Sequence, residues 1–372
     1  GEAEERGVEL LKTLHYGTPK VDIPKIDGIG FRLDGVTHYI PPNRKIASLD
    51  TLPFPAWDLF PLQNYWQLKY AHGPFETKKY LPILTSRGCP YPCTFCIIPE
   101  INDRKWRARS ANNVIDEMAE FLDKFGVREF HIEDVNPTVN GKRIREICEE
   151  IIRRNLKVIW KISSGTKVET LRDESIIELM AKAGCRYISI SPETGSPRIL
   201  KKMNKPFNLD LAIRLVKKMN DIGIRSQACF VLGYPDESDE DRQMTWQMVH
   251  DLTKVGVDEI AVFIVTPAPG SAIFDQFGDC ADYSKLTFSP TWREDYKRLN
   301  KFRLRLYMRF LYWKLRYHPL KIVKQVNNFL WRRFETKMEM TPYRALHLLL
   351  MEWRLTGKYC DNRSQKNKHN YA

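Results

Sequence analysis

Short apolar segments recur six times between residues 81 and 266, and amphipathic stretches of helical period separate them. The segments are rich in Val, Ile and Phe and have the length of strands rather than of buried helices. They comprise Leu81–Ser86, Glu129–Glu133, Lys157–Ile162, Arg186–Ser191, Arg225–Gly233 and Glu259–Thr266. Buried strands that alternate with helices predict a parallel sheet with the helices outside it.

The helix ends carry signals of their own. Ser110 is a good N-cap for the helix after the first strand, and we expect that helix to stop before Gly126. Later helices are expected to end before Gly184, Gly223 and Gly256, because glycine accepts the left-handed backbone that closes a helix. Six strand–helix units predict an α/β fold, a partial (β/α)6 barrel with its chemistry at the C-terminal strand ends.

This regular pattern covers only the middle of the chain. Before it, Glu5–Leu14 predicts a helix, Gly28–Gly35 a hairpin, and the Pro-rich residues 41–55 an extended connector. After it come helices that we expect to be broken near Pro319 and Pro342. The predicted domains are an N-terminal linker region (1–80), a barrel (81–285) and a C-terminal helical cap (286–372).

Composition narrows the class of protein. With 372 residues, 43% hydrophobic and 28% charged, the chain is globular. No apolar run approaches the ~18 residues of a membrane-spanning helix. The first residues are acidic, lack the apolar core of a secretory signal, and do not include an initiator Met. We expect a cytoplasmic protein whose chain begins inside a longer parent.

Three of the eight cysteines are clustered directly after the first predicted strand, at Cys89, Cys93 and Cys96. Three thiolates on one loop can hold three irons of a [4Fe–4S] cluster and leave the fourth iron open. A zinc site completed by a distant ligand is an alternative, although zinc usually takes two separated ligand pairs and no second pair is present. A redox disulfide is a weaker one. We expect the scattered cysteines to act mainly as core residues.

The spacing Cys-x3-Cys-x2-Cys after the first barrel strand resembles the radical S-adenosylmethionine (SAM) superfamily, over about residues 80–270. In that family the open iron binds SAM, and an electron from the cluster cleaves SAM to methionine and a 5′-deoxyadenosyl radical. That radical abstracts hydrogen from an unactivated carbon. The resemblance implies that Cys89, Cys93 and Cys96 are catalytic metal ligands, with a [4Fe–4S] cluster and SAM as cofactors. It also implies a small-molecule or lipid substrate and an electron donor such as flavodoxin or ferredoxin.

The resemblance further implies SAM contacts at the ends of the strands. It places Phe95 against the adenine, Glu133 and Asp134 at the methionine amino group, and Ser163 and Lys167 near the SAM carboxylate. Each has a plainer alternative, because an acidic residue at a strand end is often a helix N-cap and a lysine is often solvated.

The later strand ends complete the implied set. Glu193 lies where the family contacts the ribose, and Val231 and Gly233 resemble its adenine-contacting fifth strand. Val265 and Thr266 match the end of the sixth strand, although a valine can equally be a core residue. The barrel-mouth residues that we expect to face the substrate are His131, Asn136, Arg225 and Gln227.

The N-terminal region carries a second resemblance. Residues Gly1–Glu5, the hairpin and the segment Ser48–Asp58 are similar to the linker of cobalamin-binding radical SAM enzymes. That resemblance implies C-methylation and adds cobalamin as a third cofactor. The body of a cobalamin domain and its Asp-x-His-x-x-Gly signature are absent from this sequence, and a generic Pro-rich connector is the alternative.

The net charge of +13 is concentrated in residues 292–372, which hold 20 Lys and Arg but only 6 Asp and Glu. A helix there has a basic face with Lys301, Arg305, Arg309 and Arg316 and an apolar face with Phe302, Leu306, Phe310 and Trp313. Such a helix can be a solvated cap over the barrel, lie on an anionic membrane, or bind RNA. The cap ranks first and the membrane second; nucleic acid ranks last because no RNA-binding module is found.

We interpret the chain as a radical SAM enzyme that modifies an unactivated carbon of a small molecule or lipid. C-methylation, ring formation and oxidation are the candidate reactions. A tRNA-modifying methylthiotransferase is an alternative, and it would need a second set of cluster cysteines. A non-catalytic, metal-containing binding module with a basic tail is another, and it predicts no SAM cleavage.

Overall fold

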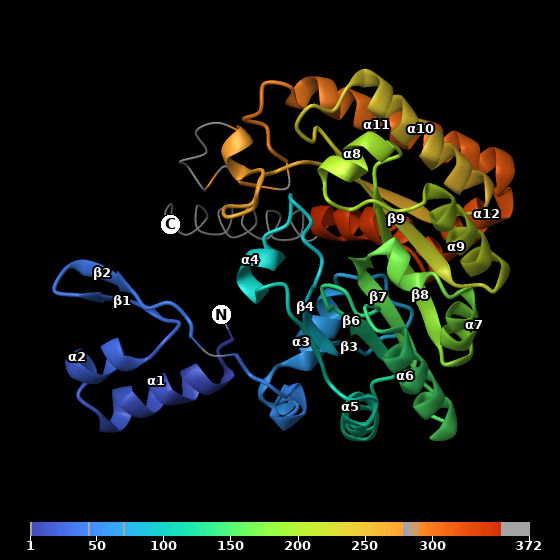
Figure 1. The fold of residues 1–372 in the computed structure, drawn as a ribbon. Coiled ribbons are helices and arrows are strands. Elements are labelled where there is room, and N and C mark those ends of the chain that lie inside the picture. The colour runs from blue at the N-terminus through green and yellow to red at the C-terminus, as the bar shows by residue number, and fades with distance from the viewer. Residues whose placement is uncertain are drawn as a thin grey trace, which may run out of the picture.

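The computed structural model of the chain describes residues 2–350 apart from 44, 70, 278–283, 285 and 288. At its centre is a parallel sheet of six strands in the order β3-β6-β7-β8-β9-β10 (Figure 1). The strands are β3 (Tyr80–Ile83), β6 (Glu129–Ile132), β7 (Ile159–Thr166), β8 (Cys185–Glu193), β9 (Arg225–Leu232) and β10 (Glu259–Ile264). Because β3 and β10 do not pair with each other, the barrel is open, and the predicted α/β partial barrel is confirmed.

The strands differ from the prediction in two ways. The first apolar segment divides, because β4 (Ser86–Gly88) leaves the sheet and pairs antiparallel with β5 (Trp106–Ala108). In addition, β7 and β8 run further than expected, to Thr166 and Glu193. Irregular register near the ends of both strands interrupts the regular pairing, which is why the apolar pattern stops early.

Helices cover the outside of the sheet (Figure 1). The long ones are α5 (Ala111–Phe125), α6 (Gly141–Arg153), α7 (Glu174–Lys182), α9 (Leu209–Asp221) and α10 (Asp239–Lys254), and α8 (Pro197–Lys202) is short. The predicted start of α5 is confirmed, since the Ser110 side chain accepts a hydrogen bond from the Asn113 N–H. Gly126 closes that helix with a φ of 65°, as expected of a glycine after a helix end.

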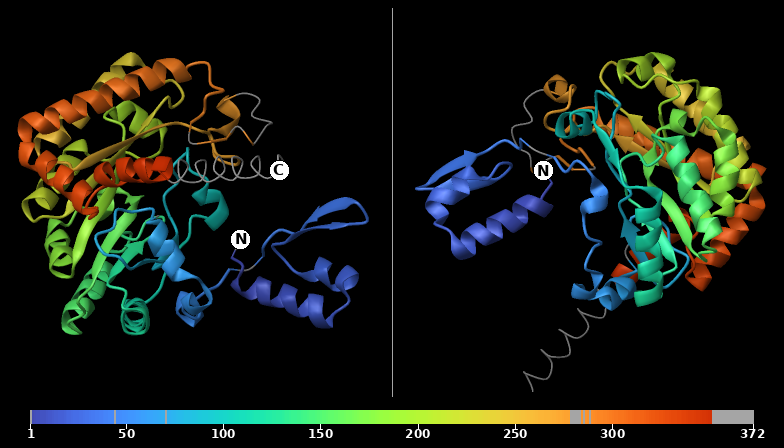
Figure 2. Two further views of the ribbon diagram at one scale, coloured as in Figure 1. Left: turned by 180° about the vertical axis from the view of Figure 1, so that it is seen from behind. Right: turned by 60° about the horizontal axis from the view of Figure 1, so that its bottom comes forward.

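The N-terminal residues form a small unit that projects from the barrel (Figures 1 and 2). It contains α1 (Glu4–Tyr16), α2 (Pro19–Asp22) and a hairpin of β1 (Gly30–Leu33) and β2 (Val36–Tyr39), and α3 (Leu62–Leu68) follows. Glu2 ties this unit to the barrel through an ion pair with Arg107. Burial alone would raise the pKa of the Glu2 carboxyl. The ion pair with Arg107 and a hydrogen bond from the Ile46 N–H outweigh burial and lower that pKa to about 2.

The C-terminal residues form helices against one side of the barrel. These are α11 (Tyr296–Tyr317), α12 (Pro319–Trp331) and the helical residues 337–350. The break at Pro319 is confirmed, but the one at Pro342 is wrong, because Pro342 lies inside the last helix and the chain bends at residues 332–336 instead. The neighbouring Met340 is 1% exposed, so packing holds the helix despite the proline.

The N-terminal opening of the barrel is closed by the bend before this last helix. The N–H groups of Lys337 and Met338 donate to the Glu259 carboxylate at the start of β10. Phe334 donates its N–H to the Phe75 carbonyl. Within the part of the chain that the structure describes, no helix is both long and apolar enough to cross a membrane.

Candidate active site

The clustered cysteines lie on the loop between β4 and α4 (Ile98–Asn102), at the C-terminal edge of the sheet. The loop therefore follows β4, the short hairpin strand. The sequence predicted instead that it follows the first strand of the sheet directly. Gly88 ends β4 with a φ of 80°, and a Cβ there would lie 2.1 Å from the Lys105 carbonyl oxygen. Only glycine lets the chain turn at this point into the cysteine loop.

This loop is fastened to the strand ends on the far side of the barrel. The Thr94 N–H donates to the Met203 carbonyl at 3.1 Å, and the Asn204 side chain donates to the Pro92 carbonyl at 3.2 Å. The hydroxyls of Thr94 and Tyr234 are 2.8 Å apart. The cysteines are thus held over the mouth of the barrel by contacts from beyond β8 and β9.

The three thiols are free and half-buried. Cys96 lies close enough to both Cys89 and Cys93 to interact with them electrostatically, and its Sγ accepts a hydrogen bond from the Ile98 N–H at 3.4 Å. Burial raises the pKa of the Cys93 thiol to about 11 and also raises that of Cys96. Iron binding would therefore displace protons from these thiols, since thiolates are the ligands.

The donor set fits an iron–sulfur cube. Among the described residues, no three His, Cys, Asp or Glu side chains converge closely enough to hold one metal ion. A cube takes one thiolate on each of three irons, so its ligands stand further apart than those of a single zinc. Cys89, Cys93 and Cys96 are free thiols on one loop and lie near one another, which suits one thiolate on each of three irons.

The structure brings together three of the residues implied for adenine. Phe95 and Val231 pack against a small apolar cluster of which Val265 is a member. The other buried members of that cluster are Ile199, Met203, Tyr234 and Ile273. An apolar surface between the cysteine loop and the last two strands is suited to the face of a planar base. Thr266 lies at its edge and donates to the Thr287 carbonyl at 2.7 Å.

Gly233 is held by a residue from the C-terminal region. Arg293 donates to the Gly233 carbonyl at 3.0 Å and to the Val265 carbonyl at 2.8 Å, so it joins the ends of β9 and β10. Gly233 has a φ of 73°, and a Cβ there would lie 2.5 Å from Leu299. Local sequence gave no signal for Arg293, which lies 60 residues further along the chain.

Glu193 ends β8 and forms a buried ion pair. Its Oε1 accepts from the Lys205 ammonium at 2.6 Å, and that ammonium also donates to the Ser191 carbonyl at 2.9 Å. Burial alone would lower the pKa of Lys205, but the Glu193 carboxylate outweighs it and raises that pKa. Both side chains are near Cys93, on which they act electrostatically. Sequence reasoning found Glu193 and missed Lys205.

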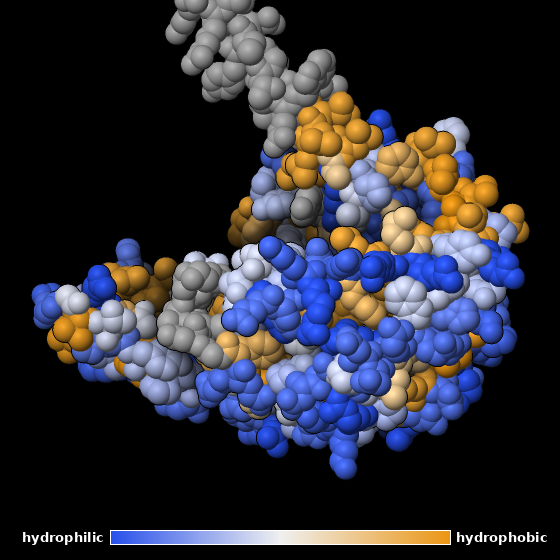
Figure 3. Space-filling model, turned by 90° about the horizontal axis from the view of Figure 1, so that it is seen from above, coloured by the Kyte–Doolittle hydropathy of each residue, from blue (hydrophilic) through white to orange (hydrophobic). Residues whose placement is uncertain are grey.

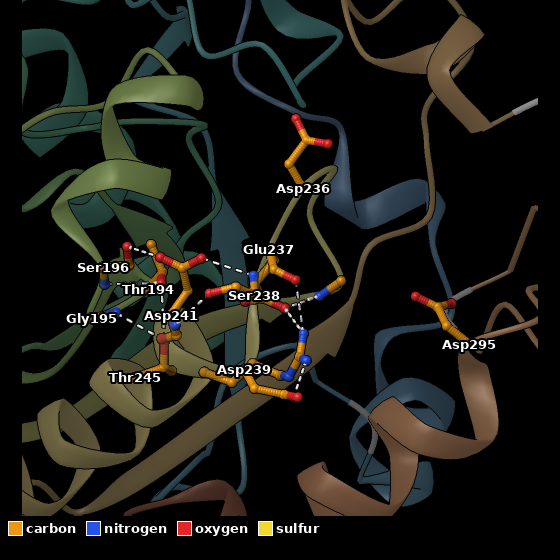
Figure 4. A network of polar contacts seen from close by, with 12 residues as sticks. Thr194, Gly195, Ser196, Asp236, Glu237, Ser238, Asp239, Asp241, Thr245 and Asp295 are labelled. Atoms are coloured by element: carbon orange, nitrogen blue, oxygen red, sulfur yellow. Dashed lines mark hydrogen bonds and ion pairs between the residues drawn. The ribbon is translucent and has the colours of Figure 1, made fainter.

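The turn after Glu193 is held by the first turns of α10 (Figure 4). Ser196 donates its hydroxyl to Asp241 at 2.5 Å, and the Gly195 N–H donates to the Thr245 hydroxyl at 3.0 Å. A Cβ on Gly195 would lie 2.2 Å from the Met244 carbonyl oxygen, so no larger residue fits. This contact fixes where β8 ends, and with it the position of the Glu193 backbone.

The same helix start holds the turn after β9 (Figure 4). The Gly233 N–H donates to the Glu237 carboxylate at 2.7 Å, and Arg242 makes an ion pair with that carboxylate. Burial nevertheless dominates and raises the pKa of Glu237 to about 7. The ends of β8 and β9 are therefore positioned by one element.

The acidic residues after β6 lie in different surroundings. Asp134 is fully buried and accepts from the Thr85 N–H, the Thr85 hydroxyl and the Ser86 hydroxyl, so it holds the link between β3 and β4. Glu133 is more open, and its Oε2 lies 2.6 Å from Nδ1 of His72. Of the two, Glu133 has the carboxylate that a ligand can reach.

Ser163 and Lys167 frame the end of β7. The Ser163 hydroxyl is buried next to Gly73 and has no hydrogen-bond partner among the described residues. Lys167 forms an ion pair with Glu169, and its ammonium lies 4.6 Å from the ring centre of Tyr91 in the cysteine loop. Both residues are next to the site, but Lys167 already has partners.

The four expected barrel-mouth residues do not lie together. Asn136 is buried just past β6. His131 and Gln227 are wrongly placed by the prediction, because they are buried within strands. They bond to Glu129 and Glu259, the first residues of β6 and β10.

The predicted position of Arg225 at the barrel mouth is also wrong. Arg225 is the first residue of β9, at the closed end of the barrel, where it pairs with Glu335 at 2.8 Å. The sequence identified its strand but not the end at which it lies.

Comparison with protein-family models matches residues 83–249 to the radical SAM superfamily. The matched segment begins in β3 and ends within α10, so it contains the cysteine loop and the ends of five sheet strands. The match agrees with the expected family over this segment, which ends before β10.

Curated relatives match more of the chain. It is 29% identical over 79% of its length to the uncharacterized methyltransferase PH0819 of Pyrococcus horikoshii, of which it covers 60%. It is also 29% identical over 79% of its length to anaerobic magnesium-protoporphyrin IX monomethyl ester cyclase of Rubrivivax gelatinosus, of which it covers 52%. The chain thus spans less than two thirds of either relative.

Solved structures share the fold at lower identity. The radical SAM methyltransferase TsrM from Kitasatospora setae, with cobalamin and a [4Fe–4S] cluster bound, aligns with a TM-score of 0.58 at 19% identity. The alignment covers 74% of this chain and 52% of that one. This likeness supports the open barrel and its flanking elements.

Proposed function

Because residues 83–249 match the radical SAM superfamily, we propose that this chain is a cobalamin-type radical SAM methyltransferase. Its substrate is a small molecule or lipid with an unactivated carbon, and an external flavodoxin- or ferredoxin-type protein supplies the electron. The observation that carries the proposal is the loop of three free, neighbouring thiols fastened over a ring of strand ends.

The residues of this chain have distinct tasks in that function. When bound, the cluster supplies the electron that cleaves SAM to methionine and the 5′-deoxyadenosyl radical. Cys89, Cys93 and Cys96 would hold the cluster. Phe95 and Val231 offer an apolar surface to the adenine. The buried apolar side chains that they pack against keep water away from that surface.

Three polar groups would orient SAM by hydrogen bonds. Glu133 can accept from the methionine ammonium, and Glu193 from the ribose hydroxyls. The unpartnered Ser163 hydroxyl can donate to the SAM carboxylate. Lys205 acts on the ribose end only through Glu193, whose carboxylate it holds in place.

Methyl transfer is the reaction class that the relatives favour. A relative and a structural neighbour of this chain are both described as methyltransferases, and the neighbour contains cobalamin. The sequence contains no Asp-x-His-x-x-Gly segment, so that signature assigns none of its residues to cobalamin. An apolar cleft of about 1040 Å³, lined by Leu49, Leu52, Phe54 and Trp57, lies beside Glu133.

The structure gives less support to a methylthiotransferase. That class needs a second set of cluster cysteines. Cys148 and Cys185 are fully buried in the main hydrophobic core, and Cys229 lies on β9 with its thiol facing Ser189. Cys148 and Cys185 lie near each other, but both are sealed in the core, and neither is exposed at the strand ends where a second cluster would have to be reached. Cys280 and Cys360 lie outside the described residues.

Cluster loading tests the proposal without relying on turnover. The full chain is reconstituted anaerobically with iron and sulfide, reduced with dithionite, and measured by metal analysis and electron paramagnetic resonance. We expect a cubane signal that shifts on addition of SAM in the wild type and in the core control Cys148→Ala. Loss of the signal is expected in Cys93→Ala. A protein that takes up only zinc, or an unchanged signal in Cys93→Ala, would overturn the proposal.

A further inference from the structure

Two C-terminal helices expose unusually long apolar stripes. Their members recur every three or four residues, so each stripe runs along one helix face. On α11 they are Leu304, Met308, Leu311, Tyr312 and Leu315, which are 39–69% exposed, and on α12 they are Leu320, Val323, Val326, Leu330 and Trp331, which are 57–81% exposed. These side chains are additional to the core face of α11, where Leu306, Phe310 and Trp313 are buried.

The stripes belong to one side of the molecule. In the view from behind, α11, α12 and the helical residues 337–350 lie side by side (Figure 2). The space-filling view from above shows hydrophobic side chains gathered along one edge of the molecule, next to a hydrophilic band (Figure 3). The last helix continues the apolar character with Leu346 and Leu349, which are 47 and 63% exposed. A globular helix normally turns polar residues outward, so this face is built for a partner.

The charge of the same helices identifies that partner. Together α11 and α12 contain ten Lys and Arg and no Asp or Glu. Lys314 and Lys321 are used inside the fold, where they bind the Asp258 backbone and carboxylate. By contrast, Lys301 and Arg305 form no ion pair among the described residues, and both line a groove of about 820 Å³ with Leu304 and Met308.

We propose that this α11–α12 face binds the surface of an anionic lipid bilayer. Exposed Leu, Met, Val and Trp side chains can enter the boundary between headgroups and acyl chains, while Lys and Arg beside them reach the phosphates. Tyr312 and Trp331 have the amphipathic rings that favour this boundary. A nucleic acid would use the charges but leave the apolar stripes exposed, and a neutral protein surface would leave the charges unmatched.

This binding does not depend on the proposed chemistry. The α11–α12 face contains none of the residues assigned to the cluster or to SAM. A chain that binds vesicles but does not cleave SAM would refute only the proposed function. A chain that cleaves SAM but ignores vesicles would refute only the membrane surface.

Vesicle flotation with the full chain tests the inference. We expect binding to vesicles of phosphatidylcholine with phosphatidylglycerol to exceed binding to phosphatidylcholine alone by at least tenfold. Raising the salt concentration should weaken it, since part of the attraction is electrostatic. The pairs Met308→Ser with Leu315→Ser, and Lys301→Glu with Arg305→Glu, should each reduce binding at least tenfold. The matched control Val36→Ser with Tyr39→Ser, on the equally exposed β2, should bind as the wild type does.

Three results would overturn the inference. The first is wild-type protein that binds neither vesicle, and the second is equal binding to both. The third is a dimer in analytical ultracentrifugation that the Met308→Ser, Leu315→Ser pair dissociates, because a second copy would then cover the face. The salt dependence of vesicle binding by the wild type tests the inference even if a variant fails to fold.

Discussion

At the scale of single residues, the site depends on charges that are buried in pairs. Glu193 and Lys205 are each less than 10% exposed and bind each other at 2.6 Å. Removal of one partner leaves an uncompensated buried charge, which costs far more than the pair contributes. The backbone of Glu193 has a φ of 67°, so the pair also holds an unfavourable conformation at the end of β8.

Replacement of the lysine tests this pair. We expect Lys205→Met to lower the free energy of unfolding by about 3–5 kcal/mol, measured by denaturant titration. The matched control Lys202→Met breaks an exposed pair with Asp236 and should cost less than about 1 kcal/mol. Similar losses in the two variants would show that Lys205 is not needed to compensate Glu193.

Gly195 offers a second test at this scale. Gly195→Ala forces a Cβ to within 2.2 Å of the Met244 carbonyl oxygen, so the turn after β8 must move away from α10. We expect a clear drop in melting temperature together with weaker SAM binding, measured by calorimetry. Gly7→Ala, in α1 with no atom within 4 Å of the new Cβ, should leave SAM binding unchanged and slightly raise stability. Normal SAM binding by Gly195→Ala would contradict the assigned role of this turn.

Residues predicted from the sequence share a property: each lies within a few positions of a recognisable strand or motif. The cysteines, Phe95 and Glu193 were predicted in this way. Lys205 and Arg293 were not, because each reaches the site from another element, and Arg225 was placed at the wrong end of its strand. Asp134 was found but serves the link between β3 and β4, which only its hydrogen bonds could show.

At the scale of elements, α10 acts as the common support of two strand ends. Its N-cap Ser238 accepts from the Asp241 N–H, and Asp241 returns a contact to the Ser238 N–H. Burial alone would raise the pKa of Asp241, but hydrogen bonds from Arg198 and the two serines hold it well below its usual range. The start of α10 therefore keeps its negative charge, which favours the positive end of the helix dipole.

Glu237, in the same region, makes stability depend on pH. Its pKa is raised to about 7 by burial, whereas the unfolded chain titrates near 4.5. Between pH 4.5 and 7 the folded state therefore binds a proton that the unfolded chain has released. The stability that this proton contributes is complete below pH 4.5 and is lost as the pH rises through 7. Glu237→Gln, which keeps an acceptor for the Gly233 N–H, should match the wild type near pH 5 and be more stable near pH 8.

Thermal melting at the two pH values checks this sign. The expected gain at pH 8 is up to about 3 kcal/mol. The control Asp236→Asn removes a neighbouring exposed carboxylate and should show no such crossover. The opposite result, a Glu237→Gln variant that loses stability relative to the wild type as the pH rises from 5 to 8, would show that Arg242 and not burial sets the pKa of Glu237.

Most elements could be predicted because their causes are local. Ser110, Gly126 and the apolar alternation act within a few residues, and the structure follows them. The separation of β4 from β3 and the helix that runs through Pro342 follow from tertiary contacts instead. Sequence alone cannot weigh a lost helical hydrogen bond against packing such as that of Met340.

At the scale of the whole molecule, charge and chemistry occupy different places. The barrel supplies the cysteine loop and the strand ends, while the net positive charge lies in the C-terminal region. From that region Arg293, just before α11, reaches the ends of β9 and β10. Sequence composition located the basic region but not its two faces. Only the packed structure shows that the apolar stripes of α11 and α12 remain outside the core.

The central claim is that the cysteine loop and the strand ends form one site for SAM cleavage. The most direct measurement is the formation of 5′-deoxyadenosine by the anaerobically reconstituted full chain, with dithionite as the reductant and SAM as the substrate. We expect this product from the wild type and from Cys148→Ala, and none from Cys93→Ala. A wild-type protein that holds its cluster and yields no 5′-deoxyadenosine, or a Cys93→Ala variant that yields as much as the wild type, would contradict it.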